Sequence, residues 1–129
     1  MRHGQGAARD TIDSYLAGLE GETRRVAKGE WGLSVDAAGW PLHVGVALRD
    51  GLLRAQAEVV RAGAIDPHVL LHWNRGLRLA RFTETSSGDV WVEADIPAEA
   101  VTPERVDGLL GLVVRVATQA REAASSSSA

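Results

Sequence analysis

The sequence contains no cysteine, and this absence excludes several kinds of site at once. Without thiols the chain cannot form disulfide bonds, use a cysteine nucleophile or bind zinc or an iron–sulfur cluster through sulfur. The sequence also lacks any apolar run near the roughly 20 residues that span a membrane. No apolar core of a signal peptide is present near the N-terminus. We therefore expect a cytoplasmic protein from a reducing compartment.

Clustered positive charge is also missing. The 14 Lys and Arg residues are outnumbered by 17 Asp and Glu residues, which gives a net charge of -3. Because nucleic-acid binders need clustered Lys and Arg to hold phosphates, direct nucleic-acid binding is not expected. Apolar residues make up 45% of the 129 residues, enough for one core and therefore one domain. Arginine greatly outnumbers lysine, which indicates a GC-rich bacterial genome.

Periodic patterns begin near residue 10 and end near residue 124. We expect a flexible N-terminus over residues 1–9, a single domain over 10–124 and a disordered tail over 125–129, where serines accumulate. A stripe of residues at steps of three and four predicts a first helix from Asp10 to Gly29. Asp66-Pro67 predicts the start of a short helix, and Thr102-Pro103 predicts the start of the last one.

Between these helices, apolar residues alternate with polar or small ones. The alternation predicts three consecutive strands around residues 31–36, 42–48 and 53–59, with a hairpin turn at Asp50-Gly51. Two further strands are predicted over residues 77–84 and 90–96. The order α-β-β-β-α-β-β-α predicts an α+β fold with an antiparallel five-stranded sheet and helices mainly on one face.

The other face of this sheet is expected to be uncovered and mostly polar. Trp91 is the exception, because a large aromatic residue there is either edge packing or a contact anchor. We expect this face to bind a partner protein, helped by strand addition at an exposed edge. Arg78 and Phe82 are also placed on this uncovered face. The candidate partner-binding residues are Trp31, His43, Arg54, Gln56, Glu58, Arg78, Trp91 and Glu93.

The apolar arc of the last helix spans roughly 200°, whereas a surface helix needs little more than about 100°. Two interpretations stay open. Either the helix is deeply seated in the core, or part of its apolar face meets a second subunit. The second interpretation predicts a homodimer with an interface at Leu112, Val114 and Val116.

Residues with catalytic potential do not form a recognisable motif. His68 and His72 lie one helical turn apart, but no third ligand accompanies them, so no metal site is predicted. No serine lies in a G-x-S-x-G motif, and no phosphate-binding loop is present. Glu93 and Asp95 share a strand face and could act as acid and base, but a solvated strand is the interpretation that we favour. No catalytic residue or cofactor is predicted.

Arginines and aromatic residues concentrate in one stretch, which is typical of single-stranded nucleic-acid binding. Nearby acidic residues dilute this charge, so a protein-recognition patch is the favoured interpretation. The residues are Trp73, Arg75, Arg78, Arg81 and Phe82.

Residues 69–82 read VLLHWNRGLRLARF and residues 90–97 read VWVEADIP, ahead of the long last helix. A short helix ending in Leu-x-x-x-Asn, a strand reaching an aromatic residue and a second strand ending in Pro resemble the YbjN-like family. That family is similar in fold to the class I type III secretion chaperones. The resemblance implies the element order given above, a homodimer and no established catalytic residues. The chain departs from the family at residues 75–77, where more Asn is usual.

We therefore expect a non-enzymatic, chaperone-like interaction module that acts as a homodimer and binds a client or partner protein. The alternatives are an accessory factor of nucleic-acid-processing proteins, a small enzyme of unknown type, or a structural subunit of a larger complex.

Overall fold

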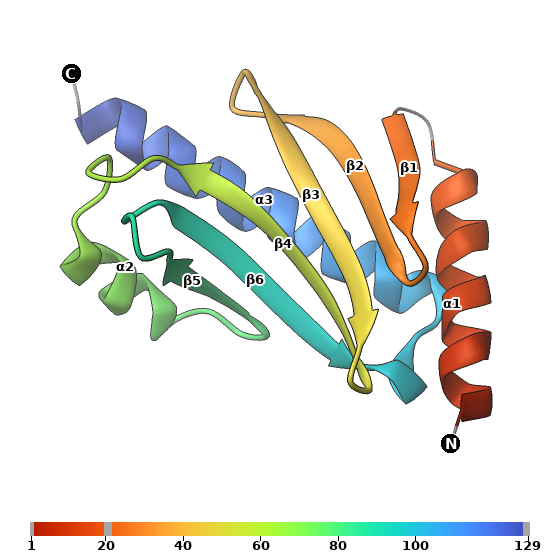
Figure 1. Cartoon of the computed structure of the whole chain (residues 1–129). Helices are drawn as coiled ribbons and strands as arrows, with labels where there is room; N and C mark the ends of the chain where they lie inside the picture. Colours follow the sequence, from red (N-terminus) through yellow and green to blue (C-terminus); the bar gives the residue numbers. More distant parts are fainter. Residues whose placement is uncertain (1, 20–21, 128–129) are drawn as a thin grey trace.

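The computed structural model describes residues 2–19 and 22–127 of the chain. Six antiparallel strands form one sheet in the order β1-β2-β3-β4-β6-β5, as Figure 1 shows. The elements are α1 (Arg2–Ala17), β1 (Glu22–Ala27), β2 (Glu30–Ala37), β3 (Trp40–Arg49), β4 (Leu52–Val60), α2 (Pro67–Asn74), β5 (Ala80–Glu84), β6 (Val90–Pro97), the 3-10 helix η1 (Ala98–Ala100) and α3 (Pro103–Ser127).

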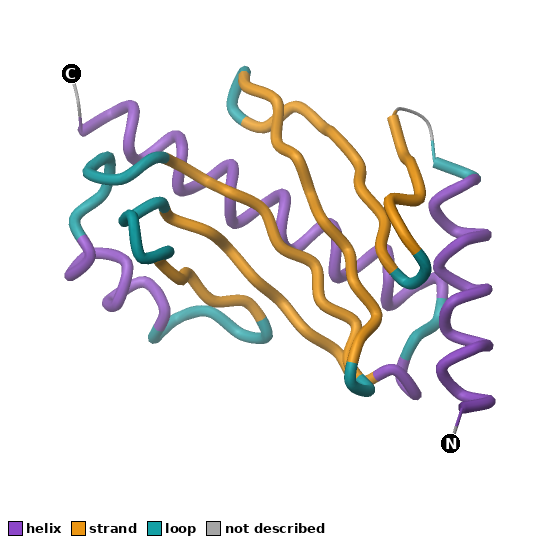
Figure 2. Tube along the Cα trace, viewed as in Figure 1, coloured by secondary structure: helices purple, strands orange, loops and turns teal. Residues whose placement is uncertain are grey.

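The helices leave one face of the sheet uncovered. Helix α3 crosses behind the sheet and contacts β2, β4, β5 and β6. Helix α1 lies along the β1 side, and α2 lies at the β5 side (Figure 1 and Figure 2). The α+β fold with helices mainly on one face is thus confirmed, and we call the opposite surface the open face.

The core lies between the sheet and α3. On β3, β4 and β6 every second side chain is buried, because successive residues of a strand point to opposite faces. These side chains pack against the apolar arc of α3. The largest fully buried side chains are Ile12, Leu42, Val44, Leu53, Val90, Val92, Val106 and Val113.

The sheet has six strands rather than five, because residues 22–27 form β1 and do not continue the first helix. A tight turn at Lys28–Gly29, with φ +75° at Gly29, reverses the chain into β2. Thr23 and Val26 fitted the helical stripe, but both are β-branched and pack well on a sheet. The helix predicted from Asp10 to Gly29 is therefore wrong at both ends, since α1 runs from Arg2 to Ala17.

Three further element boundaries lie outside the ranges that the sequence patterns suggested. Helix α1 begins at Arg2, within the segment 1–9, and α3 continues to Ser127, within the segment 125–129; the flexibility of the first segment and the disorder of the second stay predictions. Strand β5 begins at Ala80 rather than at residue 77. Leu79 has φ +66°, a left-handed conformation that interrupts an extended strand.

The carboxylate of Asp13 links helix α1 to the sheet through hydrogen bonds. Asp13 accepts a hydrogen bond of 2.7 Å from the indole nitrogen of Trp31 and pairs with Arg25 on β1. The hydrogen bond from Trp31 is the main reason that the pKa of Asp13 lies below its ordinary value. At the other side of α1, Tyr15 donates a hydrogen bond to Asp107 on α3. These contacts fix the β1 flank of the sheet.

Candidate partner-binding surfaces

The open face carries a fixed network of paired charges across β4, β6 and β5. Arg54 binds Asp95 through two hydrogen bonds, 2.7 Å from Nε to Oδ1 and 3.2 Å from Nη2 to Oδ2. Arg81 reaches Asp95 at 3.1 Å and Glu93 at 3.0 Å. Two cations and two carboxylates thus neutralise one another, and the two-point contact between Arg54 and Asp95 fixes the relative orientation of these two side chains.

This network is unsuited to acid–base catalysis. The hydrogen bond from Arg54 is the main cause that lowers the pKa of Asp95, and the bond from Arg81 adds to it. The same contact with Asp95 raises the pKa of Arg54. A general acid needs a carboxyl group with a raised pKa, so the alternative of Glu93 and Asp95 as acid and base is not favoured.

A flat, partly apolar floor adjoins the charged network. Gln56 lies in the middle of the sheet, opposite Glu93 on β6 and Gly45 on β3, and Gly45 in turn faces Gly32 on β2. Gly45 is partly exposed and has no side chain, whereas Gly32 is buried beneath the side chains of Arg24 and Val26 on β1. Trp91 is half-buried on the same face, paired with Glu58 on β4. A second polypeptide can therefore approach the backbone closely at Gly45.

Most of the expected partner-binding residues do lie on the open face. His43 is exposed there, and its Nδ1 lies 2.8 Å from the hydroxyl of Ser34 on the neighbouring strand. Strand register places the following residues on the same face: Arg54, Gln56, Glu58, Trp91 and Glu93. The structure therefore brings six of the eight candidates together on one surface, between β3 and β6.

Trp31, Phe82 and Arg78 lie elsewhere, and their expected positions are wrong. Trp31 is 3% exposed and points to the helix-covered face, so it cannot anchor a partner without opening the core. Phe82 is also buried and packs against Trp73, with ring centroids 5.8 Å apart. Arg78 precedes β5 in the connecting loop, because the left-handed Leu79 shifts the alternation. Arg81, rather than Arg78, therefore lies on the open face.

The same contacts weaken the basic–aromatic patch considered for nucleic acid. Phe82 is inaccessible, Trp73 is half-buried and Arg81 is neutralised by two carboxylates. Stacking of bases requires exposed aromatic rings beside free cations. This arrangement therefore gives no support to the nucleic-acid alternative.

The three residues expected at a dimer interface on α3 are all at least partly packed into the core. Val116 is 4% exposed, so it offers little surface to a second subunit. Leu112 and Val114 are half-buried and also pack against the core. The wide apolar arc of α3 is explained by its position behind the sheet. For Val116, the structure therefore supports the interpretation that the helix is deeply seated in the core.

Both edges of the sheet are protected against strand addition. At the β5 edge, the side chain of Asn74 on α2 pairs with both backbone groups of Phe82. Oδ1 accepts from the Phe82 nitrogen at 2.8 Å, and Nδ2 donates to the Phe82 carbonyl at 3.2 Å. At the β1 edge, the register shifts between Arg25 and Ala27. Covered edges and bulges both disfavour a further strand, so the expected strand addition is not supported.

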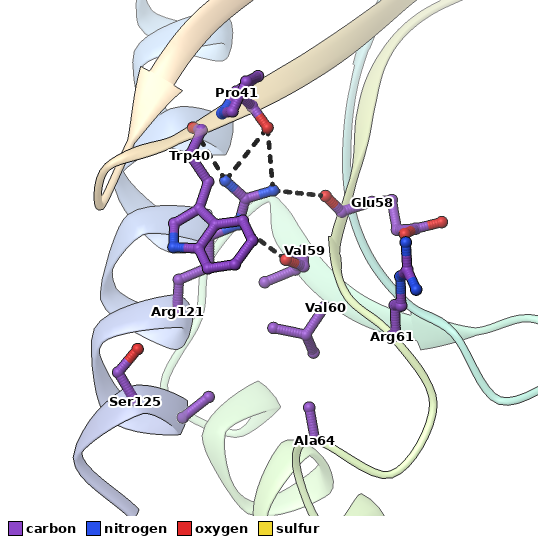
Figure 3. Close-up of a pocket in the computed structure, with 10 residues that line it drawn as sticks. Trp40, Pro41, Glu58, Val59, Val60, Arg61, Ala64, Arg121 and Ser125 are labelled. Atoms are coloured by element: carbon purple, nitrogen blue, oxygen red, sulfur yellow. Dashed lines mark hydrogen bonds between the residues drawn. The ribbon is translucent and has the colours of Figure 1, made fainter. Parts of the chain in front are cut away.

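A pocket of about 710 Å³ opens where β3 and β4 separate, beside the last turns of α3 (Figure 3). Arg121 on α3 reaches into this separation and donates hydrogen bonds to backbone carbonyls of both strands. Burial lowers the pKa of its guanidinium group. Sequence reasoning missed Arg121, although it follows Leu110, Val114 and Ala117 at helical spacing on a buried stripe. A lone arginine on such a stripe is a usable signal.

The flank formed by α2, the loop before β5 and β5 itself is the most apolar exposed region, and we call it the α2–β5 flank. Three of the six large apolar side chains that are exposed among the described residues lie here: Val69, Leu71 and Leu79. Leu71 and Leu79 are each 66% exposed. A pocket of about 300 Å³ is lined by Trp73 of α2, Leu77 of the following loop, Phe82 of β5 and Val116 of α3, among others.

Metal ligands do not gather in the described part of the chain. His68 and His72 are both exposed on α2, and no group of three His, Asp or Glu side chains with metal-binding geometry occurs among the described residues. None of the described helices is long and apolar enough to cross a membrane.

Solved structures with the same architecture define the class of fold. The chain matches one from the HopA1-SchA chaperone-effector complex with a TM-score of 0.76 at 12% identity, covering 93% of this chain and 97% of that chain. The complex of the Yersinia pestis type III secretion chaperone SycH with a stable fragment of YscM2 gives 0.67 at 14% identity, covering 87% and 98%. The ExsC-ExsE complex gives 0.67 at 20%, covering 88% and 93%. The fold is that of type III secretion chaperones.

The family follows from a second comparison. The family model of YbjN, described as "Putative bacterial sensory transduction regulator", matches residues 9–125. The chain therefore belongs to the YbjN family, which confirms the resemblance seen in residues 69–82 and 90–97. No curated protein matches the sequence.

Proposed function

We propose that this protein is a non-enzymatic, chaperone-like module of the cytoplasm that acts as a homodimer and holds a segment of a partner protein on its open face. The observation that carries the proposal is the uncovered sheet face itself. Three helices leave it free, and its side chains are fixed by the contacts among Arg54, Arg81, Glu93 and Asp95. A surface that is already ordered loses little conformational entropy when it binds.

The chemistry of the open face favours a polypeptide over a small substrate. Its charges are paired within the sheet, and Trp91 and Gln56 offer an apolar contact and an amide beside them. Protein interfaces are typically built from such aromatic and arginine contacts with a polar surround. The solved complexes add support, since SchA and SycH are each described in a complex with a second protein.

The homodimer is proposed to form through the α2–β5 flank. Leu71 and Leu79 are exposed, and residues of α2, the following loop and β5 also form part of the lining of the pocket of about 300 Å³. A surface that offers both protruding side chains and a recess can pair with its own copy about a two-fold axis. Leu79 also keeps a left-handed backbone that few leucines adopt, which is the kind of strain that structures keep at functional positions.

Photo-crosslinking tests the open face directly. A photoreactive phenylalanine analogue at Gln56 should crosslink to a defined partner polypeptide in the source cell, and Trp91→Ala should abolish that product. The matched control places the same analogue at Arg115, an exposed residue of α3 on the other side of the sheet. Crosslinks of equal yield at both positions, or none at Gln56, would refute binding at the open face.

Light scattering tests the homodimer. The wild type should have twice the 13.7 kDa mass of the chain, and Leu71→Glu should shift it toward the monomer. Leu79→Asn is a gentler variant, because asparagine tolerates a left-handed backbone. Val26→Thr removes an exposed apolar side chain on β1 and serves as the control. A wild type of single-chain mass at micromolar concentration would contradict the proposal.

A further inference from the structure

The sheet is split between the start of β3 and the end of β4. Paired residues run from Arg49 and Leu52 to Val44 and Ala57, and there the pairing stops although both strands continue. Beyond that point β4 stays paired with β6 as far as Val60. Figure 1 shows the two strands diverging in front of α3. The split exposes backbone that an ordinary sheet would pair.

Arg121 satisfies the carbonyl groups of this split with every donor that it has. Nε donates to Val59 at 2.7 Å, Nη1 donates to Ala37 at 3.1 Å and Trp40 at 3.2 Å, and Nη2 donates to Glu58 at 3.3 Å and Pro41 at 3.4 Å. An arginine has five N–H donors, all in the plane of the guanidinium group. The in-plane positions are therefore filled, and only the flat faces of the cation remain for a ligand.

The pocket beside Arg121 has mainly apolar walls. Trp40, which is 67% exposed, stands at its edge with its indole ring turned toward the cavity in Figure 3. No ring contact of Trp40 occurs among the described residues, where Trp73 pairs with Phe82. Further walls come from Pro41, Val59, Val60, Ala64 and Ala124, while Glu58 and Arg61 place opposite charges at the margin.

We propose that this pocket binds an aromatic side chain presented by a segment of the partner protein. An aromatic ring placed over the guanidinium face gains a cation–π attraction, and it packs against the Trp40 indole as well. An aliphatic side chain fills the same space without the attraction to the cation. A carboxylate meets a guanidinium group that has no donor left, so an acidic ligand gains little.

The volume is consistent with this ligand. Pockets that bind organic groups usually measure about 300–1,000 Å³, and about 710 Å³ accommodates one aromatic side chain together with neighbouring backbone. The inference rests on the proposed binding of a partner protein, but it concerns a different surface. The two surfaces meet at Glu58, but the pocket is also lined by Arg121 and Ala124 of α3, which lies across the sheet from the open face.

Nuclear magnetic resonance titrations of the full chain test the ligand class. N-acetyl-tryptophanamide should shift the Trp40 indole N–H and the Arg121 Nε–H signals in a saturable way. N-acetyl-leucinamide and N-acetylglutamate should bind at least about tenfold more weakly, as expected for loss of a partly desolvated cation–π contact. An equal or stronger response to either of these two probes, or no saturation with the tryptophan amide, overturns the inference.

Variants confirm the location. Trp40→Ala should abolish the response of Arg121, whereas Trp91→Ala on the open face should leave it unchanged. Should Trp40→Ala fail to fold, Ala124→Gln fills the pocket from α3 while leaving Trp40 in place, and it should also abolish the response. If the Arg121 signal of the folded variant, Trp40→Ala or Ala124→Gln, still responds to the tryptophan amide, the inference is overturned. Crosslinking at Gln56 is independent of these titrations, so failure at the pocket leaves the proposed function of the open face standing.

Discussion

Replacement of Arg121 by alanine should lower the free energy of unfolding by about 2–3 kcal/mol. Three of its hydrogen bonds, to Val59, Ala37 and Trp40, are 3.2 Å or shorter, and each such bond contributes about 1 kcal/mol net. The two longer bonds, to Glu58 and Pro41, add little. Water can enter the open pocket and rehydrate the carbonyl groups, which keeps the loss below that of a fully buried cluster.

Urea unfolding followed by far-ultraviolet circular dichroism measures this change. For a domain of this size the loss corresponds to a decrease in melting temperature of about 6–12 °C. Arg121→Lys keeps one cation but cannot reach both strands, so it should recover about half of the loss. Arg115→Ala, on the exposed side of α3, is the matched control and should change the stability by less than about 0.5 kcal/mol. If Arg121→Ala is as mild as this control, the arginine does not hold the split together.

Three further predictions follow from other contacts. Asn74→Ala should cost about 1–3 kcal/mol in chemical unfolding, because both backbone groups of Phe82 lose their partner; a neutral result would mean that water replaces the amide. The pKa of Asp95 is lowered in the folded state by its hydrogen bond from Arg54. Its contribution to stability is therefore present above the unfolded pKa of about 3.9 and declines as the pH falls further. Asp95→Asn should make the free energy of unfolding, measured by chemical unfolding, fall less steeply with decreasing pH. Burial and the neighbouring Asp107 raise the pKa of Tyr15 to about 12, so stability should decline as the pH rises from about 10 toward that value. Because Tyr15 is the only tyrosine in the sequence, its ionisation can be followed by tyrosinate absorbance. Absorbance that titrates near pH 10 in the native protein would contradict this prediction.

The central strands and the last helix were predictable because their patterns admit one interpretation. Alternation over residues 42–48, 53–59 and 90–96 has a period of two and places the apolar side chains, apart from Ala47 and Trp91, on one face, which the structure confirms. The Asp50-Gly51 turn is also confirmed, with both residues at positive φ. Thr102 caps α3 by accepting a hydrogen bond of 3.2 Å from the Arg105 nitrogen.

The candidate surfaces were less predictable, because they depend on contacts between distant parts of the chain. Thr23 and Val26 fit a helical period as well as a strand, so β1 was missed. A single left-handed residue, Leu79, shifted the alternation and exchanged Arg78 for Arg81 on the open face. The bonds of Arg121 to the strands span 62–84 residues, and no local pattern encodes such partners.

Strand order has a consequence for the chain during its synthesis. Strand β6 lies between β4 and β5, so the sheet is completed only when residues 90–97 have been made. The meander from β1 to β4 is local and can assemble early, but its β4 border stays unpaired until β6 has been made, and its apolar underside stays uncovered until α3 has been made. The ribosome-bound intermediate is therefore the stage at which this protein is most prone to aggregate, and a stop codon before residue 90 should yield an insoluble product.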